Sequence, residues 1–163
     1  MNAKRPRSSC QTLRFGRTGD RVSSMTELSM FFHFTCEDGW TAIEAAESIE
    51  PKSNAADHAD GPKPLIWLTD SETPADTGLC DPARTAIRIS LSPAAPARYW
   101  TVWTHLVPPA NVLGIEGAGG VPSTWYVSDA PVTANHFGKV VRVATGEVLK
   151  AAPVAPARAC VMS

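Results

Sequence analysis

His33 and Thr35 are the side chains whose types and spacing point most directly to chemistry. They lie two residues apart in residues 28–35 (LSMFFHFT), the run with the strongest strand character in the chain. Successive side chains of a strand point to opposite faces, so the imidazole and the hydroxyl should stand side by side. Such a pair can donate and accept hydrogen bonds to a polar ligand.

Other catalytic and metal-binding signatures are absent from the sequence. There is no G-x-S-x-G elbow, no glycine-rich phosphate loop and no H-E-x-x-H motif. The four histidines lie far apart in the chain: His33, His58, His105 and His136. None has a second ligand at metal spacing, so we expect no metal site. Cys80 stands beside Asp81, but no histidine lies nearby in the sequence to activate it as a nucleophile.

Length and composition predict one globular domain. The chain has 163 residues, of which 44% are hydrophobic and 19% charged. No apolar run reaches the length of about 18 residues that a membrane span needs. The basic N-terminus has no apolar stretch behind it, which argues against a signal peptide and favours the cytoplasm. The cysteines are widely scattered without C-x-x-C spacing, which favours reduced thiols.

Charge is distributed unevenly along the chain. The first 24 residues hold six of the 15 basic side chains and a single acidic one, Asp20. They carry almost no apolar residues, so we expect residues 1–24 to be a disordered extension. The acidic remainder has no footprint for nucleic acid. We therefore expect one domain over residues 25–150, followed by a loose Ala/Pro-rich tail over residues 151–163.

Strands and short helices are both expected within this domain. Thr41 and Glu44 have the form of a capping box, which predicts a helix over residues 42–49 that ends before Pro51. Residues 52–63 and 114–120 are expected to be loops, and a brief helix is possible between the prolines of 93–109. Further strands are predicted over residues 65–69, 85–91 and 123–128, with a hairpin over 139–149. The mixture predicts an α+β fold.

The first strand also carries a family resemblance. Residues 31–35 (FFHFT), a capped helix, the stop at Glu50–Pro51 and the strand 66–69 (IWLT) resemble the opening of the ADP-ribosyltransferase fold. Members with a Tyr-His-x-Thr first strand begin in a similar way, among them DarT toxins, RNA 2'-phosphotransferases and rifampin-modifying transferases. The resemblance covers residues 31–69. It implies a split, mostly antiparallel sheet with a few short helices.

The resemblance also implies a ligand, because these families use NAD as a substrate. Their first-strand histidine hydrogen-bonds the NAD ribose, and aromatic residues of later strands pack on the nicotinamide. Trp67, Trp125 or Tyr126 would provide that aromatic slot. The residues expected to contact NAD are His33, Thr35, Trp67, Thr69, Arg88 and Tyr126.

The reaction that the resemblance implies also needs a carboxylate. Cleavage of the bond between nicotinamide and ribose passes through an oxocarbenium-like state, which a nearby negative charge stabilises. Related transferases carry a late glutamate, and the late carboxylates here are Glu116, Asp129 and Glu147, none in a matching context. We name His33 and Glu147 as the catalytic candidates.

The sequence therefore predicts an NAD-dependent ADP-ribosyltransferase that modifies a protein or nucleic-acid acceptor, as a toxin or phage-linked effector. Two alternatives stay open, namely an inactive NAD- or partner-binding module of the same fold and a small structural or interaction protein. Each candidate residue also has a structural reading. His33 and Trp67 could belong to the core, and Arg88 could be a solvated strand arginine.

Overall fold

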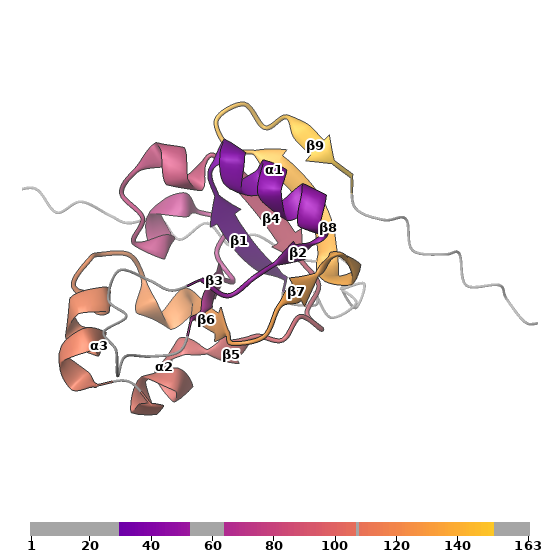
Figure 1. Cartoon of the computed structure of the whole chain (residues 1–163). Helices are drawn as coiled ribbons and strands as arrows, with labels where there is room; N and C mark the ends of the chain where they lie inside the picture. Colours follow the sequence, from indigo (N-terminus) through magenta and orange to yellow (C-terminus); the bar gives the residue numbers. More distant parts are fainter. Residues whose placement is uncertain (1–29, 53–63, 107, 152–163) are drawn as a thin grey trace, which may run out of the picture.

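A seven-stranded sheet forms the centre of the computed structural model, which describes residues 30–52, 64–106 and 108–151 (Figure 1). Its strand order is β5-β6-β3-β1-β4-β8-β9, and every neighbouring pair is antiparallel. The strands are β1 (Phe31–Thr35), β3 (Ile66–Thr69), β4 (Ile87–Leu91), β5 (Arg98–Tyr99), β6 (Trp125–Ser128), β8 (Phe137–Arg142) and β9 (Val148–Lys150). A separate two-stranded ribbon joins β2 (Ser48–Ile49) to β7 (Val132–Thr133).

Helices in the described residues are short. The α-helices are α1 (Glu37–Ala46), α2 (Trp100–Trp103) and α3 (Pro109–Glu116). Five 3-10 turns accompany them, namely η1 (Pro74–Thr77), η2 (Pro82–Thr85), η3 (Thr104–Leu106), η4 (Pro122–Thr124) and η5 (Ala134–His136). The predicted α+β class with a mostly antiparallel sheet is confirmed.

Helix α1 begins earlier than the sequence predicted, and it ends at Ala46 rather than at residue 49, because Ser48–Ile49 form β2. Its N-cap is Cys36, whose Sγ accepts a hydrogen bond from the Gly39 amide at 3.3 Å. Thr41, the predicted cap, is inside the helix and donates its hydroxyl to the Glu37 carbonyl. The predicted capping box was wrong, because Cys36 and not Thr41 is the N-cap residue of α1. The earlier start brings Trp40 into the helix, where it is buried.

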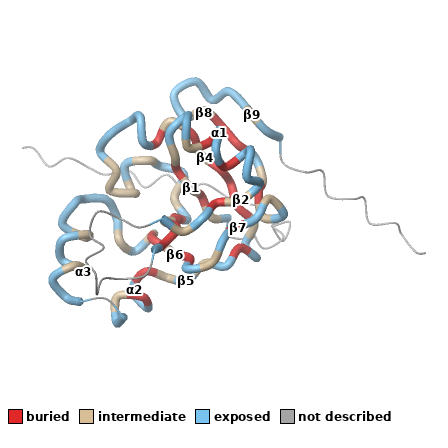
Figure 2. The backbone as a smooth tube through the Cα atoms, in the orientation of Figure 1, coloured by how far each residue is buried: buried red, intermediate tan, exposed pale blue. Residues whose placement is uncertain are grey.

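The two faces of the sheet are covered by different elements. On one face, Trp40 and Ile43 of α1 and Ile49 and Val132 of the ribbon pack on the central strands. That cluster continues through Ile66, Leu68, Ile87, Ile89, Leu91, Phe137 and Val140. On the other face, α2 contributes Trp100 and Trp103, which pack with Leu65, Trp125 and Val127. Figure 2 shows the buried residues concentrated in the central strands, whereas no residue of α3 or β9 is buried.

The expected alternation of side chains holds in the central strands. Phe32 and Phe34 of β1 are buried, while His33 and Thr35 are half-buried on the other face. In β4, Ile87, Ile89 and Leu91 are fully buried, and Ser90 on the opposite face is buried as well. β4 is therefore more enclosed than the half-buried strand that its pattern predicted.

Several expectations fall on residues that the structure does not describe. They are the disordered extension over residues 1–24, nearly all of the tail over 151–163 and most of the loop over 52–63. The helix expected within residues 93–109 is α2. The loop expected over 114–120 is partly wrong, because α3 continues to Glu116.

Candidate functional site

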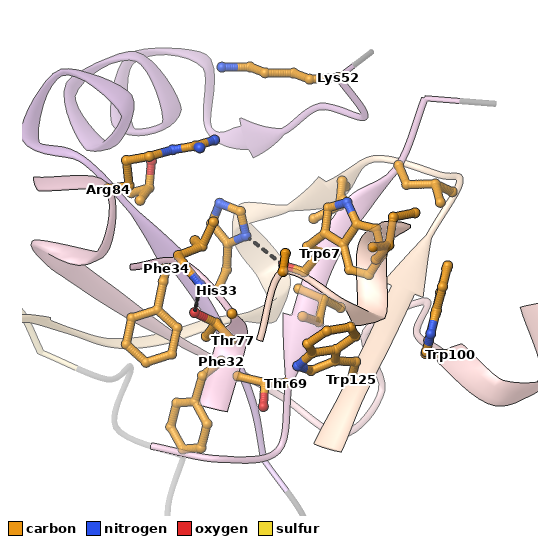
Figure 3. Close-up of a pocket in the computed structure, with 18 of the residues that line it drawn as sticks. Phe32, His33, Phe34, Lys52, Trp67, Thr69, Thr77, Arg84, Trp100 and Trp125 are labelled. Carbon is orange, nitrogen blue, oxygen red and sulfur yellow. Dashed lines mark hydrogen bonds between the residues drawn. The ribbon is translucent and has the colours of Figure 1, made fainter. Parts of the chain in front are cut away.

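A cleft of about 780 Å³ opens where β1 and β3 separate (Figure 3). The two strands pair at Phe32 and Thr69, whereas β1 pairs with β4 along its whole length. The cleft therefore takes residues from both faces of the sheet. It continues past the end of β2, residues 77–79 and α3. Its volume lies within the range of ligand sites, about 300–1,000 Å³.

His33 stands at the gap between the two strands. Its Nδ1 lies 2.9 Å from the carbonyl oxygen of Trp67, so Nδ1 donates the hydrogen bond. The imidazole thereby binds a carbonyl that would accept a hydrogen bond from a β1 amide if the pairing of β1 with β3 continued. In the described part of the chain, Nε2 has no hydrogen-bond partner, and it points toward the side where Lys52 and Arg84 lie (Figure 3).

The charge state of His33 follows from these surroundings. Burial lowers its pKa below the usual 6.5; the bond to Trp67 opposes this shift, and the positive charge of Lys52 adds to it. The neutral form is therefore favoured at neutral pH. With Nδ1 protonated by its bond to the carbonyl, Nε2 is left as a hydrogen-bond acceptor.

Three tryptophans gather at one end of the cleft. The ring of Trp67 lies 4.9 Å from that of Trp100 and 6.0 Å from that of Trp125. Trp100 and Trp125 are buried, and their indole N–H groups are bound to Glu116 Oε1 and the Asp76 carbonyl. Trp67 is half-buried. Trp100 and Trp125 hold the Trp67 ring by packing, and Trp67 forms an apolar, aromatic part of the cleft wall.

Charged side chains lie elsewhere in the cleft. Lys52 and Arg84 are both exposed, and neither forms an ion pair with a described residue. Glu50, an exposed residue, also lines the cleft, and its carboxylate accepts a hydrogen bond from Ser48 Oγ at 2.6 Å. The cleft is therefore aromatic at one end, basic at the other, and has His33 between them (Figure 3).

Thr35 and Thr69, two of the residues expected to contact NAD, also line the cleft. Thr69 is 2% exposed, and its hydroxyl is bound to the Ser71 amide and to Thr124 Oγ1. Its hydroxyl therefore holds the end of β3. Thr35 is half-buried against α1, where a Cβ on Gly39 would lie 2.1 Å from Thr35 Oγ1. That glycine lets the helix start close to the strand.

Arg88 and Tyr126, two of the residues predicted to contact NAD, lie outside the cleft. Arg88 forms an ion pair with Glu72 at 2.8 Å, and its guanidinium lies over the Phe32 ring. Tyr126 packs between Phe31 and Tyr99. In β6, Tyr126 pairs with Leu68, so its side chain shares the face opposite to Trp67.

Glu147, the predicted catalytic carboxylate, lies in the turn between β8 and β9. It forms an ion pair with Arg142, which also binds Glu37 of α1 at 2.7 Å. The bond to Arg142 lowers the pKa of Glu37. Arg142 thus ties the hairpin to the start of α1, and Glu147 is not brought to the cleft.

Residues that the sequence reading did not select complete the cleft. Lys52 falls in the predicted loop over residues 52–63, and Glu50 falls at the predicted stop of a helix. Arg84 lies in η2, and Asn111 comes from α3, which was not predicted. One usable signal was the pair Glu50 and Lys52 flanking Pro51, since an extended chain puts such neighbours on one side.

No group of three or more His, Cys, Asp or Glu side chains among the described residues is arranged to hold a metal ion. Within the same ranges, every helix is too short or too polar to cross a bilayer. Comparison with protein-family models, curated proteins and solved structures finds no match to this chain. Function has to be inferred from the cleft and from the motif around His33.

Proposed function

We propose that the cleft binds NAD and that the protein transfers ADP-ribose to a macromolecular acceptor in the cytoplasm. The observation that carries this proposal is the position of His33, bound through Nδ1 to Trp67 with Nε2 directed into the cleft. The resemblance of residues 31–69 to the opening of ADP-ribosyltransferases supports the same ligand.

Neutral His33 suits a sugar hydroxyl. Its Nε2 can accept a hydrogen bond from a ribose hydroxyl, while the Trp67 carbonyl fixes the ring and its tautomer. A hydrogen bond of this kind in a desolvated site contributes about 1.5 kcal/mol. His33 would orient the ribose, whose C1' carries the bond that breaks.

The two ends of the cleft match the two parts of a dinucleotide. Trp67, whose ring packs against those of Trp100 and Trp125, supports stacking of a flat ring at the aromatic end. Lys52 and Arg84 support binding of the pyrophosphate, since neither is neutralised by a described carboxylate. A volume of about 780 Å³ is suitable for a ligand of this size.

Calorimetric titration of the full chain with NAD tests the binding step. We expect saturable binding that Lys52→Ala and Arg84→Ala weaken, whereas Arg98→Ala, a change of an exposed arginine in β5, leaves the affinity unchanged. A wild-type protein that shows no heat of binding and no NAD-dependent rise in Tm contradicts the proposal.

The second candidate function is an NAD-binding module without turnover. The observation that favours it is the position of Glu147, which is held by Arg142 outside the cleft. Labelled NAD separates the two functions, because a transferase releases nicotinamide and labels an acceptor, whereas a binding module does neither.

A further inference from the structure

We infer that Glu50 supplies the carboxylate of the transfer reaction. This inference rests on the proposed binding of NAD. Among the described residues that line the cleft, Glu50 is the one that carries a carboxylate. A transition state with positive charge on the sugar gains most from a negative group already fixed beside it. Glu50 lies much earlier in the chain than the late glutamate that the family resemblance leads one to expect.

The backbone at Glu50 is fixed on both sides. Ile49 pairs with Val132 in the β2–β7 ribbon, and both side chains are buried in the core. Pro51 follows, and a residue before proline is held in an extended conformation. The carboxylate is therefore carried by a rigid segment, as a site that must hold its geometry needs.

The side chain of Glu50 is also oriented. Ser48 Oγ donates a hydrogen bond of 2.6 Å to Oε1. No described residue binds Oε2, which leaves one carboxylate oxygen available to a ligand hydroxyl or a water. Ser48 is thus a positioning residue, because it selects the direction in which the carboxylate points.

Glu50 and His33 line the same cleft. Lys52, two residues after Glu50, lies on the side toward which His33 Nε2 points (Figure 3). A ribose held by His33 would therefore have the Glu50 segment beside it. Lys52 would meet the phosphates on the same side.

Three other described glutamates are already engaged. Glu37 and Glu147 are both bound to Arg142. Glu116 accepts a hydrogen bond of 3.0 Å from the indole N–H of Trp100. A glutamate tied to an arginine or to a buried indole is less able to stabilise a developing cation.

The bond between ribose C1' and the nicotinamide nitrogen breaks, and its electron pair neutralises the positive ring nitrogen. An oxygen of the acceptor, or of water, forms the new bond to C1'. The proton of that oxygen passes to the Glu50 carboxylate and then to solvent. Nicotinamide and the ADP-ribosylated acceptor are the products.

Nicotinamide release from NAD by the full chain, with water as acceptor, tests this assignment. We expect Glu50→Gln to lower the rate about a hundredfold, as loss of an acid–base group does, with NAD affinity changed less than about threefold. Ser48→Ala should lower the rate about tenfold. Glu44→Gln, on the exposed side of α1, is the matched control and should keep the wild-type rate.

The outcomes separate this inference from the proposed function. Absence of NAD binding by the wild type overturns both. NAD binding without nicotinamide release by the wild type overturns both the role of Glu50 and the transfer activity, and it leaves the NAD-binding module. Full release by Glu50→Gln overturns the role of Glu50 alone. Loss of release in Glu147→Gln with retention in Glu50→Gln would transfer the role to Glu147. Melting curves of each variant show whether a lost rate comes from a lost fold.

Discussion

The Nδ1 atom of His33 lies 2.9 Å from the Trp67 carbonyl oxygen, across the point where β1 and β3 stop pairing. One side chain therefore holds two strands together and also presents its second nitrogen to the cleft. The two interpretations of His33, as a core residue and as a ligand-binding residue, are compatible. Substitutions of His33 should consequently affect both stability and binding.

Replacement of His33 by alanine removes both interactions. We expect NAD affinity to fall about ten- to a hundredfold. Stability should fall by about 1–3 kcal/mol, because the part-buried Trp67 carbonyl loses its partner. Calorimetry and urea denaturation measure the two effects. His105→Ala, in the exposed turn η3, is the matched control, and equal effects of both variants would contradict the assignment.

The pH dependence of stability follows from the lowered pKa of His33. Burial disfavours the protonated form in the folded chain, whereas the unfolded chain takes up a proton below the ordinary pKa of 6.5. The unfolded state then binds more protons, so the contribution of His33 to stability is fully present above pH 6.5. It is lost as the pH falls from there through the lowered pKa of the folded chain. We expect the wild type to lose stability relative to His33→Gln on acidification. Parallel curves of denaturation midpoint against pH would contradict this.

Trp67 should report on the ligand by fluorescence. Its ring is half-buried in the cleft wall, whereas Trp40 is buried on the opposite face under α1. We expect NAD to quench the wild-type emission, Trp67→Phe to lose most of that quenching, and Trp40→Phe to keep it. A quench that survives in Trp67→Phe would place the ligand elsewhere.

Local patterns predicted the elements that surround the site better than the site itself. Alternation in β1 correctly placed His33 beside Thr35 and buried Phe32, since it needs only neighbouring residues. The assignment of Tyr126 to the NAD site needed the register of β6 against β3. That register pairs Tyr126 with Leu68 and so turns it away from Trp67.

Long-range contacts also determine where the predicted catalytic carboxylate, that of Glu147, lies. Arg142 and Glu147 are close in the hairpin, but Glu37 reaches the same arginine from the first turn of α1. No sequence pattern links positions so distant. Similarly, the separation of β1 from β3, which opens the cleft, has no local signature, because each strand alone is regular.

Lys52 and Arg84 should make NAD binding sensitive to salt. Both are exposed, so each contributes roughly 1 kcal/mol to holding a phosphate, or about a fivefold loss of affinity in Lys52→Ala or Arg84→Ala. Screening by salt should weaken the wild type more than the double variant. Calorimetry at low and at high salt measures the difference, and the same salt dependence in both proteins would exclude a phosphate-binding role.

Gly78 lines the cleft at a point where its backbone approaches that of Gly119 closely. It has a φ of +75°, and a Cβ there would lie 2.4 Å from the Gly119 carbonyl oxygen. Gly146, in the turn between β8 and β9, has a similar φ of +72° but nothing within 4 Å of a built Cβ. Both alanine variants must therefore pay the cost of the left-handed conformation, about 1–2 kcal/mol. Only Gly78→Ala must also push the 117–120 backbone away.

Gly78→Ala should therefore destabilise the protein more than Gly146→Ala and should weaken NAD binding as well. The reason is that Gly78 lines the cleft, and the Asp76 carbonyl beside it accepts the Trp125 indole N–H and the Val121 amide. A shift of this segment would move the aromatic end of the cleft. Urea denaturation gives the stability difference and calorimetry the affinity. Equal destabilisation by the two variants, with unchanged affinity, would show that residues 77–79 do not shape the binding site.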